Sequence, residues 1–156
     1  RQAGAPALHR SVFDPLPGQG RWATVLLADG NIGIGGMPAS LLHRCAQLAA
    51  PDGQILIEAE PGNVDEQVTA WLEHPDGRRG PHFPWARMGT TALLRAATDA
   101  GLHVVDQWEH ADRAFVLATR APARPEERKL TDPESAPTVR DKSFETSKRK
   151  RLTLLK

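Results

Sequence analysis

Two short apolar runs and an amphipathic segment between them dominate the first third of the chain. Residues 22–28 (WATVLLA) and residues 54–60 (QILIEAE) predict two strands, and their apolar positions run more continuously than strict alternation would. Strands of that kind are covered on both faces, which is typical of a parallel sheet. The segment between them predicts a helix from Pro38 to about Ala50 with one apolar stripe. The stripe is formed by Leu41, Leu42, Cys45, Leu48 and Ala49.

Weaker patterns flank this strand–helix–strand unit. Residues 11–13 are compatible with the end of a short strand, and residues 64–73 alternate in part, which is compatible with another strand. Residues 74–77 predict a turn by their Pro-Asp-Gly content, and residues 78–84 predict a loop.

A second helix and a hairpin are predicted to close the domain. Thr90 or Thr91 can cap the helix, and Gly101 is placed to stop it. Residues 102–110 and 113–119 then predict two antiparallel strands joined by a tight turn.

The composition changes at residue 121. Residues 121–156 are rich in Pro, Ser, Thr and charged residues, which predicts a disordered charged tail after a domain over residues 1–120. The basic run at residues 148–151 fits a solvated tail, and it also fits a patch for an acidic partner or nucleic acid. Because the net charge of the whole chain is only +1, the composition gives no clear indication of a nucleic-acid partner.

A few single features narrow the setting of the protein. The single cysteine, Cys45, rules out an internal disulfide and favours a reducing, cytoplasmic compartment. No run approaches the roughly 20 apolar residues of a membrane span, so no membrane association is expected. The histidines are scattered without a metal-ligand spacing, so no metal site is predicted. The chain begins with Arg1 rather than Met, from which we expect a start within a longer protein, processing or an incomplete sequence.

A glycine-rich segment, residues 30–36 (GNIGIGG), joins the first strand to the first helix. Its spacing matches neither a P-loop nor a dinucleotide-binding motif, and no lysine follows it. Three interpretations stay open. The segment can bind phosphate at the helix N-terminus, lie at the edge of the sheet where α/β folds bind ligands, or simply need a flexible backbone.

Three segments, taken in order, carry a resemblance to a known family. They are residues 11–28 (SVFDPLPGQGRWATVLLA), residues 48–58 (LAAPDGQILIE) and residues 100–117, where a helix ends in Ala-Gly and two strands follow. In this order they resemble the C-terminal half of a class I S-adenosylmethionine-dependent methyltransferase, over about residues 8–120. Residues 29–36 (DGNIGIGG) resemble a bacterial small-molecule subgroup, in which an acidic residue would be expected where Met37 stands.

The resemblance implies an α/β fold with a partial Rossmann-like methyltransferase sheet. Its strands would be equivalent to the family's fourth to seventh, and an antiparallel hairpin would close it. The resemblance also implies S-adenosylmethionine as the cofactor. The family's glycine-rich cofactor loop, which follows its first strand, has no counterpart in this sequence, and we expect it before Arg1.

The resemblance further assigns cofactor-binding residues. Ser11 and Val12 match the place where the family contacts the adenine ring, although an ordinary strand end explains them as well. Ala28 and Asp29 leave the first strand at the cofactor and substrate pocket. Asp29 is the candidate catalytic residue, which would orient the acceptor or act as a base, and the alternative is a turn-forming Asx residue.

Three other residues are candidates for substrate binding. Asn31 leaves the first strand on the same edge of the sheet. Phe83 and Trp85, in the segment PHFPWARMG, can wall a substrate pocket, although packing of this loop against the sheet explains them as well.

Two functional hypotheses follow from these observations. The first is a methyltransferase that moves the methyl group of S-adenosylmethionine to a small-molecule acceptor, mainly by positioning the reactants. The second is a truncated, non-catalytic remnant or interaction module of the same fold. Without preceding strands, the apolar strand over residues 23–28 would be an open edge, so we expect self-association through it.

Overall fold

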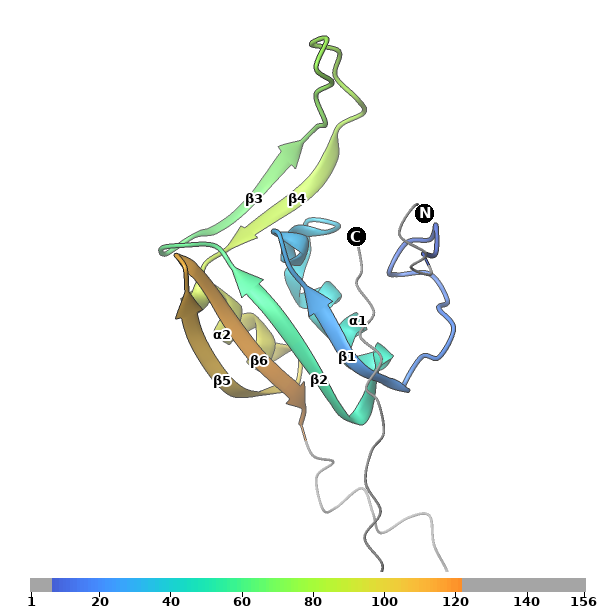
Figure 1. The fold of residues 1–156 in the computed structure, drawn as a ribbon, viewed down its shortest axis with the longest axis vertical. Helices are drawn as coiled ribbons and strands as arrows, with labels where there is room; N and C mark the ends of the chain where they lie inside the picture. Colours follow the sequence, from blue (N-terminus) through green and yellow to red (C-terminus); the bar gives the residue numbers. More distant parts are fainter. Residues whose placement is uncertain (1–6, 122–156) are drawn as a thin grey trace, which may run out of the picture.

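The protein has a four-stranded sheet with two helices on one face and a two-stranded arm that projects from one end (Figure 1). The computed structural model describes residues 7–121, so the predicted tail lies outside the described residues except for Ala121. The elements, in chain order, are β1 (Trp22–Leu27), the short helix η1 (Asn31–Gly33), α1 (Pro38–Leu48), β2 (Ala49–Ala59), β3 (Asp65–Ala70), β4 (Phe83–Met88), α2 (Thr90–Asp99), β5 (Leu102–His110) and β6 (Arg113–Arg120).

The main sheet has the strand order β1-β2-β6-β5. β1 and β2 are parallel and are connected by α1, while β6 pairs antiparallel with both β2 and β5. A parallel pair linked by a helix and closed by an antiparallel hairpin is the partial sheet that the sequence predicts. The α/β fold class is therefore confirmed.

Helix α1 is built as its sequence pattern predicts. It begins at Pro38. Proline is tolerated there because the N–H groups of the first helical turn have no hydrogen-bond acceptor within the helix. Its apolar stripe faces the sheet, and every member of the predicted stripe is fully buried. With 11 and 10 residues, α1 and α2 are short, and no helix of the described chain is long and apolar enough to cross a membrane.

The junction between α1 and β2 differs from the prediction. The helix ends at Leu48, and β2 begins at once with Ala49, which pairs with Trp22. Only two residues further along β1, Thr24 already pairs with Gln54, so the intervening residues of β2 bulge out of the sheet. The helix predicted to about Ala50 therefore ends earlier, and residues 51–53 (PDG) form a bulge inside a strand longer than the predicted one.

Helix α2 starts without the predicted threonine cap. Gly89 stands at the N-cap in an extended conformation, and neither Thr90 nor Thr91 caps the helix with its side chain. The N–H of Gly89 donates to the carbonyl of Val64 at 2.7 Å. A side chain on Gly89 would collide with the carbonyl oxygen of Gly62, so this close approach of two backbones requires a glycine.

The hairpin of β5 and β6 is confirmed. Gly101 precedes it with a φ of 74°, which suits the predicted stop of α2. The turn residues Ala111 and Asp112 have φ values of 48° and 62°. Positive φ at both central residues is the geometry that two-residue hairpin turns prefer.

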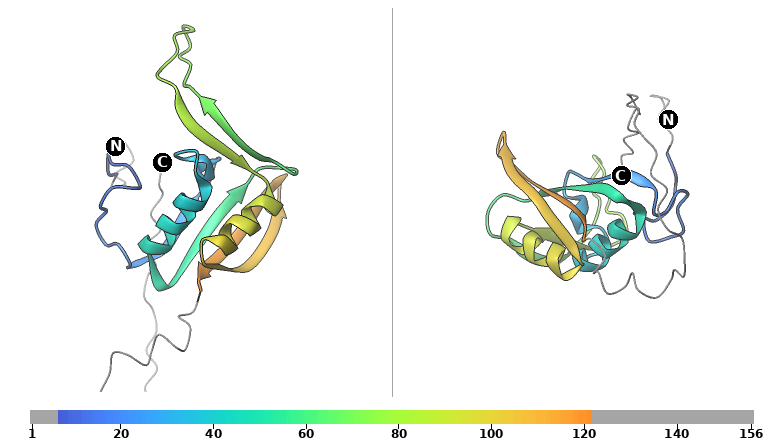
Figure 2. Two further views of the ribbon diagram at one scale, coloured as in Figure 1. Left: turned by 180° about the vertical axis from the view of Figure 1, so that it is seen from behind. Right: turned by 90° about the horizontal axis from the view of Figure 1, so that it is seen from below.

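β3 and β4 form the separate arm, which leaves the main sheet and points away from it (Figures 1 and 2). β3 is the strand expected within residues 64–73. The loop predicted over residues 78–84 is wrong at its end, because Phe83 and Pro84 already belong to β4. Pro84 lacks an N–H and interrupts any strand pattern, so the sequence gives little sign of β4.

The two faces of the main sheet are covered differently. Both helices lie on the same face (Figure 2), where Val25 and Val116 are fully buried. The opposite face carries a row of half-buried leucines, Leu26, Leu56 and Leu117, on neighbouring strands. Within the described part of the chain, no helix covers this second face and no strand pairs with the outer edge of β1.

Candidate functional site

Charged side chains gather at the edge of the sheet where the parallel strands end, which we call the carboxyl edge. β1 and β2 run in the same direction, so both end there, and the antiparallel β6 begins there. Asp29 follows β1, Glu58 lies near the end of β2, and Arg113 opens β6. In open α/β sheets, ligands bind outside this edge.

A single guanidinium joins the three strands at the carboxyl edge. Nε of Arg113 donates to Oε1 of Glu58 at 2.7 Å, and its Nη2 donates to Oε2 of the same carboxylate and to Oδ1 of Asp29, the latter at 3.1 Å. The backbone N–H of Asp29 donates to Oε2 of Glu58 at 2.7 Å. The guanidinium also lies over the ring of Phe115, 5.6 Å from the ring centroid.

These contacts give the two carboxylates different roles: Glu58 is held in place, and Asp29 remains accessible. The hydrogen bond from Arg113 lowers the pKa of Glu58 against the effect of burial, and the N–H of Asp29 adds to the lowering. Glu58 in turn raises the pKa of Arg113, so both groups stay charged at neutral pH. Only 14% of the Glu58 side chain is exposed, compared with 74% for Asp29. Asp29 is therefore the carboxylate that a ligand can reach.

The glycine-rich segment owes its composition to close packing against β4. A side chain on Gly33 would collide with the carbonyl oxygen of Ala86 and with the indole of Trp85. A side chain on Gly36 would lie 2.8 Å from Cβ of Pro84. The backbone space that a phosphate would need is filled by the arm, so the phosphate-binding interpretation does not fit.

The three substrate candidates come together around this packing. Ile34 forms a bridge with Trp85, and a side chain on Gly30 would lie 3.9 Å from the same indole. Phe83 meets Trp85 edge-on, with ring centroids 6.0 Å apart. Phe83 and Trp85 thus lie on a strand, not in a loop, and Trp85 packs on the segment that carries Asn31.

Ser11 and Val12 lie in a turn, so the strand end expected there is wrong. The hydroxyl of Ser11 accepts a hydrogen bond from the N–H of Phe13 at 3.2 Å, which favours the turn over an extended chain. The ring of Phe13 lies 3.1 Å from the place of a Cβ on Gly35. This turn therefore borders the glycine-rich segment.

The buried side chain of Arg44, on α1, binds the turn that contains Ser11 and Val12. The residue is 9% exposed, and its Nε and Nη2 donate to the carbonyl oxygens of Val12 and Asp14 at 2.9 and 2.7 Å. Its Nη1 donates to the side-chain oxygens of Gln19 and Gln47 at 2.9 and 3.1 Å. Four neutral acceptors around one buried cation fix this stretch of chain onto α1.

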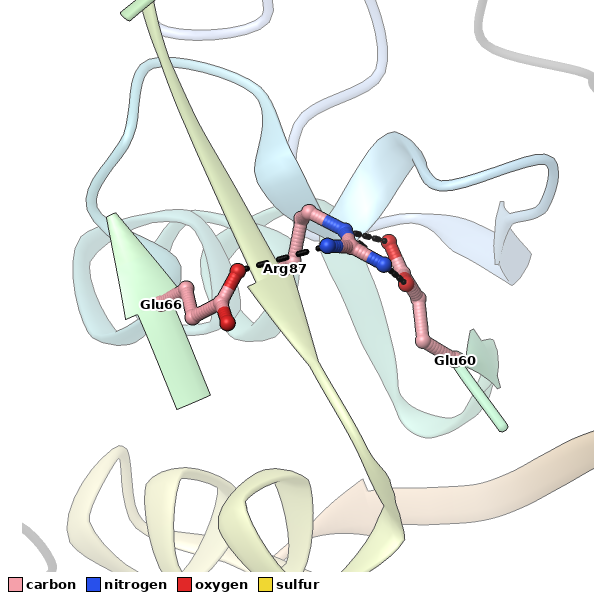
Figure 3. Close-up of polar contacts among 3 residues, drawn as sticks. All are labelled: Glu60, Glu66 and Arg87. Carbon is pink, nitrogen blue, oxygen red and sulfur yellow. Dashed lines mark hydrogen bonds and ion pairs between the residues drawn. The ribbon is translucent and has the colours of Figure 1, made fainter. Parts of the chain in front are cut away.

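A second charged cluster fixes the arm to the main sheet (Figure 3). Arg87 of β4 binds the carboxylate of Glu60 with Nε at 2.9 Å and Nη2 at 2.6 Å, and its Nη1 reaches Glu66 of β3 at 3.3 Å. The hydrogen bonds that Arg87 donates to Glu60 raise the pKa of Arg87. The N–H of Glu60 also donates to the carbonyl of Met88 at 2.8 Å, so backbone and side chains together hold the base of the arm.

Two hollows lie beside the turn between β5 and β6. One measures about 210 Å³ and is lined by residues that include Glu60, Thr90 and Arg113. The other measures about 230 Å³ and is lined by residues that include Trp108 and Phe115. Sites that bury a drug-sized ligand measure roughly 300–1,000 Å³. Neither hollow can enclose a molecule as large as S-adenosylmethionine.

Cys45 is part of the core and is not a reactive group. It is fully buried on the helix stripe, as the sequence predicts, and burial raises the pKa of its thiol to about 12. Among residues 7–121, no group of three or more His, Cys, Asp or Glu side chains is placed to hold a metal ion.

The sequence pattern does not single out most of the charged groups at the carboxyl edge. Glu58 and Glu60 carried a usable signal, because they interrupt an apolar strand at its carboxyl end, where ligand-side residues are expected. Arg87 lies in a strand that was not predicted. Arg113 follows a tight turn, and nothing in its neighbourhood indicates that it faces Glu58.

Solved structures resemble this chain, whereas no family model and no curated protein sequence matches it. A methyltransferase from Bacteroides fragilis, S-adenosylmethionine-dependent and solved with S-adenosyl-L-homocysteine, superposes with a TM-score of 0.51 and 21% identity, over 65% of this chain and 48% of its own. The glycopeptide N-methyltransferase MtfA superposes with a TM-score of 0.51 and 16% identity, over 76% of this chain and 66% of its own.

These likenesses establish the fold of the chain. It has the α/β architecture of S-adenosylmethionine-dependent methyltransferases, with the parallel pair β1–β2 and the closing hairpin β5–β6 in one sheet. The chain spans about half to two thirds of the length of these two structures.

Proposed function

We propose that this chain is the C-terminal, acceptor-side part of a bacterial methyltransferase that uses S-adenosylmethionine and methylates a small molecule in the cytoplasm. The observation that supports the proposal best is the sheet itself. Its order β1-β2-β6-β5 occurs in a fold shared with known methyltransferases, and its carboxyl edge carries a reachable carboxylate. Ligands of open α/β sheets bind at that edge.

The described residues fit one side of a cofactor site and not the whole of it. Gly33 and Gly36 are packed against β4, so the glycine-rich segment offers no backbone cradle. We therefore infer that most of the contacts to S-adenosylmethionine come from outside the described residues. A segment preceding Arg1 or another chain can supply it along the outer edge of β1, which has no partner strand in the described structure.

Asp29 is the proposed ligand contact of this chain. Arg113 uses one of its carboxylate oxygens, and a carboxylate can accept further hydrogen bonds from a hydroxyl or an amine. Because Arg113 already engages one oxygen of its side chain, we assign Asp29 the orientation of a ligand rather than the removal of a proton. Ala28 brings its backbone to the same place, and Ser11 and Val12 are proposed to border the adenine ring.

Asn31, Phe83 and Trp85 are the proposed wall of the acceptor site. Methyl transfer needs the nucleophile and the methyl group held in line, so a rigid wall contributes by positioning. Here the rigidity comes from the contact of Trp85 with the glycine-rich segment and from the ion pair between Arg87 and Glu60.

The second candidate is a truncated, non-catalytic interaction module of the same fold. The packed glycine-rich segment favours it, because no complete cofactor cradle exists among the described residues. The half-buried leucines on the uncovered face of the sheet favour it as well, since such a face suits a partner.

Titration calorimetry with S-adenosylhomocysteine separates the two candidates. The methyltransferase proposal predicts saturable binding in the micromolar range when the segment or chain that supplies the other cofactor contacts is present. It also predicts that Asp29→Asn weakens binding about tenfold or more, because losing a hydrogen bond to a charged group costs about 1.5–3 kcal/mol.

The matched control for this titration is Asp52→Asn, an exposed aspartate in the bulge at the far end of β2. It should leave the affinity unchanged. A folded protein that gives no binding heat with that segment or chain present contradicts the methyltransferase proposal and favours the interaction module.

A further inference from the structure

The outer edge of β3 is an open strand edge. β3 pairs with β4 on one side, and the described chain places no strand on its other side. Five of its six residues are exposed. Because the arm points away from the main sheet (Figure 1), no other element of the described chain covers this edge.

The opposite edge of the arm is already blocked. On β4, Trp85 forms its bridge with Ile34 of the glycine-rich segment. Pro84 has no N–H to offer to another strand. Pairing with a further strand is therefore possible on the β3 side of the arm and obstructed on the β4 side.

β3 carries none of the usual devices that protect an edge. Natural proteins blunt free edges with lysine, proline or bulges, and the sequence DEQVTA has neither lysine nor proline. Its two acidic residues do not act as free repelling charges. Asp65 is paired with Arg95 at 3.1 Å, and Glu66 is paired with Arg87 at 3.3 Å.

The arm also presents apolar side chains in fixed positions. Val68, Trp71 and Leu72 are 38%, 40% and 70% exposed. The guanidinium of Arg79 lies 4.6 Å from the ring centroid of Trp71, and the ring of His82 lies 5.3 Å from it. Exposed Trp held by Arg is a composition typical of protein contacts, because little side-chain freedom is lost on binding.

A second copy of this chain is the partner that fits this edge. A two-stranded hairpin is marginally stable by itself, and further strands stabilise it. Two β3 strands related by a two-fold axis at Val68 would pair antiparallel. In that register Asp65 and Glu66 of one copy would face Trp71 and Ala70 of the other, so no like charges would meet.

We propose that two copies of the chain pair through β3, which joins their arms into one four-stranded sheet of order β4-β3-β3-β4. The interface is isologous, so it closes at the dimer and does not propagate into fibres. It is distinct from the pairing of β1 edges that the apolar strand over residues 23–28 predicts. It also does not depend on methyltransferase activity.

Sedimentation velocity over a range of concentrations tests the proposal. The unmodified chain is compared with three variants, each of which carries one lysine on a different open strand edge. The unmodified chain should form a dimer in the micromolar range. Val68→Lys places two like charges on the axis and should weaken the dimer at least tenfold. Ala23→Lys on β1 and Val105→Lys on β5 are matched controls, because both positions are exposed on edge strands. Both should remain dimeric.

Several results would overturn the proposal. A monomer at about 100 μM, well above the Kd expected for a specific dimer, is one of them. A Val68→Lys chain that still forms the dimer is another. Loss of the dimer in Ala23→Lys or Val105→Lys would place the interface on β1 or β5 and would contradict the proposal equally.

A cross-link provides a second test that does not rely on a weakened dimer. Cys45 is fully buried, so Val68→Cys adds the accessible thiol. Directly opposed residues of antiparallel strands lie about 4.5–5.5 Å apart at Cα, which is within reach of a disulfide. Mild oxidation should link two Val68→Cys chains, whereas Val105→Cys should stay monomeric on a reducing-agent-free gel. A dimer that Val68→Cys cannot link has its axis elsewhere, which contradicts the proposed register.

Discussion

At the scale of single residues, Arg113 determines the geometry of the carboxyl edge. Its guanidinium contacts the carboxylates of Glu58 and Asp29, and those two residues come from different strands. Removing it leaves Glu58, which is mostly covered, without its main partner. The turn at Asp29, with a φ of 55°, would keep only its backbone bond to Glu58 among these contacts.

Arg113→Gln should lower the free energy of unfolding at neutral pH and flatten its dependence on pH. The pKa of Glu58 is depressed in the folded protein, so its contribution is complete above the unfolded pKa and is lost as the pH falls through the folded one. Urea unfolding should therefore show the unmodified protein losing more stability than the variant between about pH 5 and pH 3.

The control for this comparison is Arg95→Gln. Arg95 forms an ion pair with Asp65 in which both side chains are more than half exposed, and such pairs contribute little. Its pH profile should match that of the unmodified protein. Identical profiles for Arg113→Gln and the unmodified protein would show that the ion pair with Glu58 does not stabilise the fold.

Local sequence pattern predicts part of the site and cannot predict the rest. Asp29 and Asn31 were placed correctly at the carboxyl edge, because they directly follow an apolar strand. The pairing of Glu58 with Arg113 joins residues 55 positions apart. It depends on the antiparallel register of β2 and β6, which periodicity alone does not specify.

At the scale of elements, α1 follows from a local sequence pattern, whereas the arm depends on contacts between residues distant in the sequence. The stripe of α1 is a local pattern with a helical period, so its burial could be predicted before the fold was known. β4 exists because of distant contacts. It pairs with β3, and Trp85 fits against Gly33, where any side chain would collide. The bulge in β2 is likewise set by its pairing with β1.

Arg87→Gln should loosen the arm and leave the main sheet intact. The variant loses the two-pronged contact with Glu60 and the contact with Glu66 (Figure 3). Hydrogen exchange followed by mass spectrometry should show faster exchange over β3 and β4 and unchanged exchange over β2 and β6.

The control for the arm is Arg78→Gln, which removes an exposed ion pair with Asp76 near the tip. Exchange at the base of the arm should not change in this variant. Equal exchange of the arm in Arg87→Gln and the unmodified protein would contradict the anchoring role of the cluster with Glu60.

At the scale of the whole molecule, the two faces of the main sheet are buried to different degrees. The helices bury Val25 and Val116, whereas Leu26, Leu56 and Leu117 stay half-buried on the other face. The outer edge of β1 has no partner strand among the described residues. Both features are consistent with a chain that spans about half to two thirds of the two methyltransferase structures named above.

The central claim is that S-adenosylmethionine meets this chain at the carboxyl edge. Titration of the isotope-labelled chain with S-adenosylhomocysteine, followed through its amide NMR signals, tests it most directly. The claim predicts that Ala28, Asp29 and Asn31 shift in a saturable way, while Gly53 at the far end of the sheet does not. Shifts confined to that far end, or none at all in a folded chain, would contradict it.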